Sequence, residues 1–403
     1  MHLFRSRPFA LLFAGEAING IGSWAALIAL WGFAAYRFGS GPTEIALLAL
    51  CWSAPAALLG PAIGVPIDRL GPRRVLLVSY AASAAAAAAM AFAGSLTQLA
   101  GLTIVYGVCT AVSTPAADSL PPRIVDDADL VAANALLGSA QESAIVFGPL
   151  VAAAAIAVAG LRAAFLVDAA TYLVGVAVIF PLELRPLEPR PHVGLRVELG
   201  EGLTMAARIP VVRYVMVLST SVFLSWAAFV VLEPLYARDV LHRPASQFAL
   251  FQVAFGCGLV LTGLALPRLA TRLAIIQPMA VALAVLTSGF AAALYIGTKN
   301  VTLAYVGVFL WGVDVGFFVT PARTLLQRAV PPHAHGRVFA LWHTANSLSD
   351  VVALSGTGFL IAAVGVRAAG LGMAAALGLT GIAGLLLQPK APTVAGEVLA
   401  TAA

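Results

Sequence analysis

The sequence predicts an all-α membrane protein of twelve transmembrane helices, arranged as two halves of six. Three observations point to this fold class. Only 10% of the 403 residues are charged and the mean hydropathy is +0.96, whereas a soluble domain carries roughly 25% charged residues on its surface. Twelve apolar stretches of spanning length follow one another, and the basic residues between them gather on one side. Most of the chain therefore faces lipid, where a helix satisfies its own backbone hydrogen bonds.

The apolar stretches are separated by short polar gaps. A spanning helix needs roughly 20 apolar residues. The stretches that meet this length are 8–36, 43–66, 75–93, 99–118, 131–159, 163–184, 211–236, 246–269, 275–296, 301–322, 336–364 and 368–388. The first is too long for the apolar core of a cleavable signal peptide, so we expect it to remain as a helix.

The basic residues predict the orientation of the chain. If the N-terminus lies inside, 17 of the 23 Lys and Arg residues fall in inner gaps and 6 in outer gaps. Positive residues collect on the cytoplasmic side of a membrane. We therefore expect a multi-pass protein of the bacterial inner membrane with both termini in the cytoplasm.

The predicted helices fall into two halves that are related to each other. We assign 1–184 to the first half, 185–210 to a cytoplasmic linker able to form an amphipathic helix, 211–390 to the second half and 391–403 to a cytoplasmic tail. Stretch 64–74 matches stretch 263–272 at an offset of 199 residues, and stretch 113–116 matches 319–322 at an offset of 206. Transporter folds are commonly built from such repeats around a central site.

The gap after the second stretch carries a motif of glycine, acidic and basic residues. Its members are Gly64, Asp68, Arg69, Gly71, Arg73 and Arg74. Glycine permits a tight turn, and arginines interact with an anionic leaflet. The motif resembles the signature loop of the major facilitator superfamily. That resemblance implies a latch between the halves on the cytoplasmic side, with Asp118 as its acidic partner; an ordinary basic loop is the alternative.

Other stretches resemble one branch of the superfamily. Residues 113–123, 129–135 and 325–339 look like the siderophore exporters and macrolide-efflux proteins. Gly138, Gly148 and Pro149 resemble the exporter motif of the fifth helix, which implies close packing and a bend there; a tolerated kink is the alternative. Thr103 stands where related drug antiporters carry an arginine, so we do not expect a proton relay copied from them.

Ionisable groups inside the apolar stretches are candidate working residues, because each costs about 2.5–3.5 kcal/mol to insert. A carboxyl removed from water can carry a proton near neutral pH, or it can pair with a buried donor and fix the packing. Both roles remain open for the proton-coupling candidates. Asp168 and Glu233 lie near the outer ends of their stretches, so we expect them to be structural or solvated. The proton-coupling candidates are Glu16, Glu142, Asp314 and Asp350.

Polar and aromatic residues at similar depth are candidates for the wall of a substrate cavity. Asn19 and Ser23, at positions i+3 and i+7 from Glu16, share one helix face with it, and Trp24 lies beside that face. The candidates are Asn19, Ser23, Trp24, Gln141, Trp226, Phe229, Trp311, His343 and Asn346.

The resemblance implies a secondary active transporter that exports a small amphipathic or hydrophobic compound by alternating access and proton antiport. A drug, a siderophore or a secondary metabolite would each fit. We expect the substrate, protons and membrane lipid as partners, no nucleic acid, and a monomer. No metal or other cofactor is expected, and no phosphate-binding loop for ATP is present in the sequence. Uptake or facilitated diffusion, and a non-transporting membrane sensor, are the alternatives; an enzyme is not expected.

Overall fold

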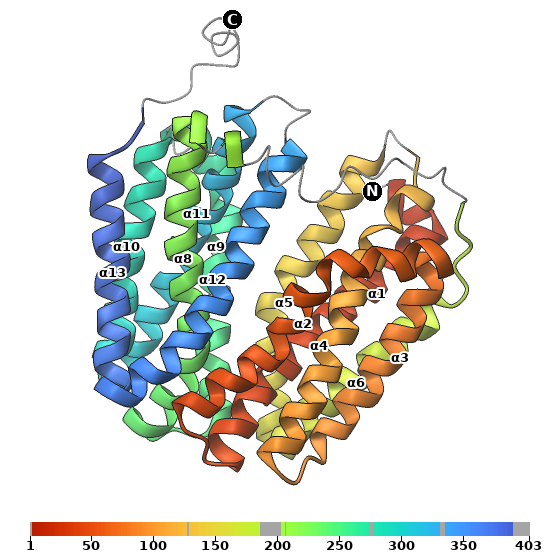
Figure 1. Cartoon of the computed structure of the whole chain (residues 1–403), viewed down its shortest axis with the longest axis horizontal. Helices are drawn as coiled ribbons and strands as arrows, with labels where there is room; N and C mark the ends of the chain where they lie inside the picture. Colours follow the sequence, from red (N-terminus) through yellow and green to blue (C-terminus); the bar gives the residue numbers. More distant parts are fainter. Residues whose placement is uncertain are drawn as a thin grey trace, which may run out of the picture. The chain divides into compact units, whose positions relative to one another are not determined.

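The computed structural model describes residues 2–126, 129–185, 203–205, 207–273, 277–330 and 335–389. Over these ranges the regular structure is helical, without a strand, and twelve long helices follow one another (Figure 1). The predicted all-α class and the predicted helices are therefore confirmed. Eleven helices in the described part of the chain are long and apolar enough to cross a membrane, and α2 is the remaining long helix.

Contacts divide the chain into two compact units, Met1–Arg190 with His242–Val253 and Pro191–Leu241 with Ala254–Ala403. The first unit contains α1 (Arg7–Gly32), α2 (Pro42–Leu70), α3 (Pro72–Ala91), α4 (Leu96–Asp118), α5 (Leu130–Ala159) and α6 (Leu161–Ile179). The second contains α8 (Pro210–Leu235), most of α9 (Ala245–Leu273), α10 (Pro278–Gly297), α11 (Val301–Ala329), α12 (His335–Val364) and α13 (Val366–Leu386). Residues 186–202 of the predicted linker and the whole predicted tail lie outside the described residues.

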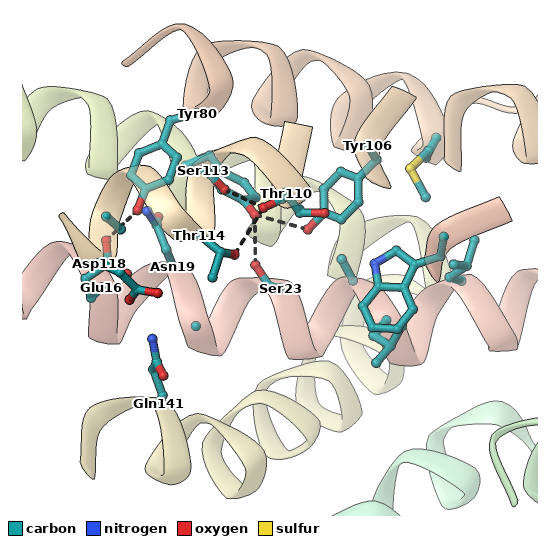
Figure 2. Close-up of a pocket in the computed structure, with 18 residues that line it drawn as sticks. Glu16, Asn19, Ser23, Tyr80, Tyr106, Thr110, Ser113, Thr114, Asp118 and Gln141 are labelled. Carbon is teal, nitrogen blue, oxygen red and sulfur yellow. Dashed lines mark hydrogen bonds between the residues drawn. The ribbon is translucent and has the colours of Figure 1, made fainter. Parts of the chain in front are cut away.

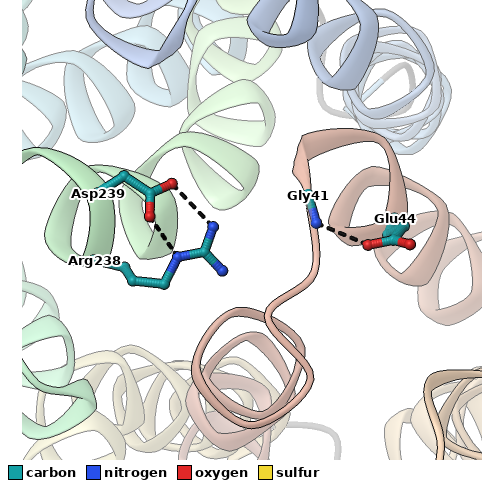
Figure 3. A network of polar contacts seen from close by, with 4 residues as sticks. All are labelled: Gly41, Glu44, Arg238 and Asp239. Atoms are coloured by element: carbon teal, nitrogen blue, oxygen red, sulfur yellow. Dashed lines mark hydrogen bonds and ion pairs between the residues drawn. The ribbon is translucent and has the colours of Figure 1, made fainter.

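Local sequence signals explain where the helices begin and end. Proline occupies the first turn of α1, α2, α3, α8 and α10, where its missing N–H is not needed. The side chain of Ser95 caps α4 by accepting from the Gln98 N–H. Glu44 accepts from the Gly41 N–H at 2.8 Å and closes the start of α2 (Figure 3). The turn between α2 and α3 is made by Gly71, whose φ of 82° favours glycine.

Within each unit the helices pack in a matching pattern. In the first unit α1 packs against α5 and α6, α3 against α4 and α6, and α2 against α4. In the second unit α10 packs against α11 and α13, and α8 packs against α12 and α13.

The internal repeat extends to details that the sequence comparison did not reach. The first helix of each unit ends in a five-residue π-helical turn, η2 (Phe33–Arg37) after α1 and η5 (Tyr236–Val240) after α8. Both turns place an arginine near the end of the helix, and Arg238 forms a 2.6 Å ion pair with Asp239 (Figure 3).

The repeat is also visible in two close contacts between helix backbones. A Cβ added to Gly107 of α4 would lie 2.6 Å from the Trp52 carbonyl oxygen of α2. A Cβ added to Gly312 of α11 would lie 2.0 Å from the Phe255 carbonyl oxygen of α9. Glycine therefore brings the same pair of helices together in both units.

Candidate functional site

A cavity of about 220 Å³ lies inside the first unit, among the side chains of all six of its long helices (Figure 2). Among the residues that line it in the described part of the chain there are two carboxyls and no Lys, Arg or His. Its apolar lining includes Trp52 of α2 and Met90 of α3. Its polar lining consists of Glu16, Asn19, Ser23, Tyr80, Tyr106, Thr110, Ser113, Thr114, Asp118, Gln141 and Tyr172.

One face of α1 supplies the centre of this polar lining. Glu16, Asn19 and Ser23 all line the cavity, as their i, i+3 and i+7 spacing on one helix allows (Figure 2). Tyr80 of α3 donates a hydrogen bond of 2.5 Å to Oε1 of Glu16. Short contacts of this kind are typical when a hydroxyl donates to a carboxylate. The structure also brings Gln141 of α5 to the same cavity.

A second polar cluster begins at the cavity wall and continues into the core of the unit. Ser23 Oγ lies 3.1 Å from the hydroxyl of Tyr172 on α6. The hydroxyl of Tyr106 on α4 lies 3.5 Å from that of Tyr172 and donates a 2.9 Å hydrogen bond to Oδ2 of Asp168. The rings pack on one another, with the Tyr172 centroid 5.3 Å from that of Tyr80 and 6.1 Å from that of Tyr106.

Small residues allow α1 and α6 to approach closely enough for these clusters to form. A Cβ added to Gly22 would lie 2.0 Å from Oγ1 of Thr171 and 3.0 Å from Oδ1 of Asp168. A Cβ added to Gly175 would lie 2.4 Å from Nδ2 of Asn19. Helices inside a membrane commonly use glycine for such close packing.

A model of the Major Facilitator Superfamily matches residues 12–354, which is most of the chain. The chain belongs to this superfamily. The resemblance inferred from the signature loop is thereby confirmed. Superfamily members are membrane transporters of small molecules and not enzymes, so the protein is a multi-pass membrane transporter.

Superfamily relatives cover nearly the whole chain at low identity. An uncharacterized MFS-type transporter of Bacillus subtilis, YfiS, is 23% identical over 381 residues, which is 91% of this chain and 90% of the relative. Macrolide efflux protein A of Streptococcus pyogenes is 22% identical over 367 residues, covering 86% of this chain and 87% of its own. The crystal structure of an auto-inhibited POT family peptide transporter gives a TM-score of 0.73 at 13% identity, covering 96% and 99% of the two chains.

The signature loop of the superfamily contributes to packing within the first unit. Arg73 donates to the backbone carbonyl oxygens of Ile179 and Phe180, and its guanidinium lies 5.6 Å from the centre of the Phe180 ring. It therefore occupies the C-terminal end of α6, where a cation is favourable. Arg69 and Arg74 are exposed. The side chain of Asp68 and the surroundings of Gly64 lie outside the described part of the structure.

Asp118 was expected to act with the signature loop, and its latch role stays a prediction. In the structure it lines the same cavity as Glu16, at the end of α4. The cavity therefore has a carboxyl on α1 and another on α4 (Figure 2).

The exporter motif of α5 lies against α1. A Cβ added to Gly148 would lie 2.3 Å from Cβ of Trp24 and 2.9 Å from the Ile21 carbonyl oxygen. Trp24 does not line the cavity that the structure describes. Gly138 has open space around it, and Pro149 lies inside the helix. Of the predicted motif, Gly148 is thus the residue in close helix contact.

The other predicted site residues belong to the second unit or have undescribed side chains. Phe229 and Trp311 are buried at 1% and 3% exposure, with ring centroids 4.4 Å apart, while Trp226 stacks on Phe223. Oδ1 of Asp314 accepts a 2.8 Å hydrogen bond from Thr287. Two further candidates on α12, Asn346 and Asp350, are half-buried. The side chains of Glu142 and His343 lie outside the described residues.

Sequence reasoning missed three tyrosines and misjudged the exposure of two carboxyls. Asp168 has no exposed surface and Glu233 is 5% exposed, so the solvated role considered for both is wrong. Tyr80, Tyr106 and Tyr172 stand inside apolar stretches, where a phenolic hydroxyl also needs a partner. Treating tyrosines like carboxyls within those stretches would have found them.

Proposed function

We propose that the protein is a secondary active exporter of a small amphipathic or hydrophobic compound, driven by proton antiport with alternating access. We place it in a bacterial inner membrane with both termini in the cytoplasm, in agreement with the distribution of Lys and Arg. Export is supported by the similarity to macrolide efflux proteins over most of both chains. Proton coupling is supported by the cavity of the first unit.

The observation that carries the proposal is the position of Glu16. Its carboxyl lines the cavity and accepts from the Tyr80 hydroxyl, and none of the described lining residues is basic. A carboxyl held in a membrane cavity without a basic neighbour is costly in its ionised form. The charge of Glu16 can be compensated either by a proton or by a positively charged substrate. Competition between these two ligands would couple proton entry to substrate export.

The cavity wall also narrows the chemistry of the substrate. Trp52 and the tyrosines offer aromatic faces, the hydroxyls of Thr110 and Thr114 offer hydrogen bonds, and the two carboxyls attract positive charge. An amphipathic compound with a protonated amine fits this wall better than an anionic one. Of the classes considered from the sequence, an amine-bearing drug or metabolite is therefore favoured over an anionic siderophore.

The test is proton-driven transport by the purified chain in liposomes. With an imposed pH gradient, the wild type should accumulate the cationic dye rhodamine 6G, and erythromycin should compete with it. Glu16→Gln removes the titratable group while keeping the side-chain shape, so this variant should equilibrate the dye without accumulating it. Glu44→Gln is the matched control, because Glu44 is exposed and only closes the start of α2.

Four results would contradict the proposal. Accumulation by Glu16→Gln equal to that of wild type would remove Glu16 from the coupling. Wild-type transport that is unchanged when the pH gradient is collapsed would exclude proton antiport. A wild type that only equilibrates the dye would be a facilitator, and one that moves neither compound in either direction would support the sensor alternative.

A further inference from the structure

Asp168 is a buried carboxyl for which the proposed coupling through Glu16 has no use. It lies on α6 with no exposed surface. Oδ2 accepts from Tyr106, while Oδ1 has no hydrogen-bond partner among the described residues. A carboxylate charge held in the membrane interior by neutral hydroxyls alone is poorly compensated. A proton on the carboxyl would remove that charge.

The groups around Asp168 offer no positive charge. From α1 the nearest ionisable residue is Glu16, from α3 it is Tyr80, and from α4 it is Tyr106. α6 itself adds Tyr172 and Arg162, and Arg162 is exposed, with its guanidinium 5.9 Å from the centre of the Phe92 ring and not on Asp168. The only ionisable residue within α5 is Glu142, whose side chain lies outside the described part of the structure. Among the described residues, neither oxygen of Asp168 is paired with a basic side chain.

The hydroxyl of Tyr106 lies between Asp168 and the cavity and has a single hydrogen to share. It lies 2.9 Å from Oδ2 of Asp168 and 3.5 Å from the hydroxyl of Tyr172, which in turn lies 3.1 Å from Ser23 Oγ. When Asp168 is ionised, Tyr106 donates to it. When Asp168 carries a proton, Asp168 can donate to Tyr106, and the Tyr106 hydrogen can turn to Tyr172. The cluster thus has one arrangement for each protonation state.

We propose that Asp168 is a second proton-binding residue of the first unit, connected to the cavity by the hydroxyls of Tyr106, Tyr172 and Ser23. A proton entering from the cavity passes to the Tyr172 hydroxyl, which releases its own hydrogen to Tyr106. Tyr106 then releases its hydrogen to Asp168. Each hydroxyl gains one proton and loses one, so only the carboxyl changes its charge. The use of this proton in transport rests on the proposed proton antiport.

The two carboxyls lie at different heights in the unit. Ser23 follows Glu16 by seven residues on α1, about 10 Å along the helix axis. Asp168 lies level with Gly22 of α1, six residues or about 9 Å beyond Glu16, because a Cβ added to Gly22 would lie 3.0 Å from Oδ1 of Asp168. Between them lies the cavity, whose polar wall and volume allow water to continue the hydrogen-bonded path. Protons would therefore cross part of the membrane inside this unit.

The test measures carboxyl protonation directly and needs no substrate. The purified full chain in liposomes is stepped between acidic and alkaline pH, and the C=O stretching bands of protonated carboxyls are recorded by infrared difference spectroscopy. We expect one band to be lost in Asp168→Asn and a different band to be lost in Glu16→Gln. Tyr106→Phe should shift the Asp168 band, because the carboxyl loses its hydrogen-bond partner. In D₂O the band should shift, and this exchange should slow severalfold in Tyr172→Phe and Ser23→Ala.

Matched control variants distinguish a band lost because its carboxyl was removed from a band lost because the protein did not fold. Asp239→Asn removes a carboxyl from a surface ion pair, and Tyr214→Phe removes a hydroxyl that donates to two backbone carbonyl oxygens. Both should keep the Asp168 band, and size-exclusion profiles should match across the set. A full set of wild-type bands in Asp168→Asn, or an Asp168 band that does not exchange in D₂O, would overturn the proposal. Failure of proton-driven export would leave these bands unchanged, so the two proposals fail separately.

Discussion

An alanine at Gly148 should push α5 away from α1. The added Cβ would lie 2.3 Å from Cβ of Trp24 and 2.9 Å from the Ile21 carbonyl oxygen, whereas non-bonded carbons rest about 3.5–4.0 Å apart. Rotation of a side chain cannot relieve these contacts, because both Cβ atoms and the carbonyl are fixed to their backbones. The helices must therefore separate by about 1 Å locally, and overpacking of this kind costs about 1–3 kcal/mol.

The assay for this prediction compares two glycines of the same helix. A Cβ at Gly138 would meet nothing within 4 Å, and alanine is better than glycine inside a helix by roughly 0.5–1 kcal/mol. The free energy of unfolding, measured by titrating the protein in mixed micelles with SDS, should fall by about 1–3 kcal/mol in Gly148→Ala. It should stay level or rise slightly in Gly138→Ala. Equal values for the two variants would refute close packing at Gly148 and favour a simple kink at Pro149.

Three further predictions concern packing and capping and use the same unfolding measurement. Phe229→Ala should lose about 3–5 kcal/mol, because Phe229 is buried against Trp311; a loss below about 1 kcal/mol would mean that the cluster is not a core. Gly312→Ala should be strongly destabilised relative to Gly372→Ala, since a Cβ meets the Phe255 carbonyl oxygen at 2.0 Å in the first and open space in the second. Ser95→Ala should cost about 1 kcal/mol through the lost cap, with faster hydrogen exchange in the first turn of α4, and unchanged exchange there would contradict the cap.

Hydropathy located the helices well but stopped where the apolar part of each helix stops. The stretch predicted at 301–322 corresponds to α11, which ends seven residues later, at Ala329. The helix continues past Pro321 into polar residues whose backbone still makes helical hydrogen bonds. The stretch 43–66 extends to Leu70 in α2 for the same reason. In the opposite direction, the stretch 163–184 is too long, since α6 ends at Ile179 shortly before Pro181. Apolar length and helix length are different quantities.

The candidate site was predictable only along one helix. The spacing of Glu16, Asn19 and Ser23 placed them on one face, and the structure gives that face the cavity. The partners of that face, Tyr80 and Tyr172, come from α3 and α6, and nothing in one sequence says which faces of distant helices meet. Their approach depends on glycines such as Gly175, whose importance becomes visible only when the neighbouring helix is in place.

The matching glycines of the two units identify equivalent positions with different chemistry. Tyr106 immediately precedes Gly107, and Trp311 immediately precedes Gly312. The first donates to a buried carboxyl, whereas the second is enclosed by Phe229 and Phe255. At this pair of equivalent positions the two units therefore differ: one position supplies a hydroxyl to a buried carboxyl, and the other supplies a ring to an aromatic cluster. Exchanging tyrosine and tryptophan between these positions should remove the hydrogen bond to Asp168 in the first unit and loosen the aromatic packing in the second. The two units share a fold, but these equivalent positions have different chemical roles.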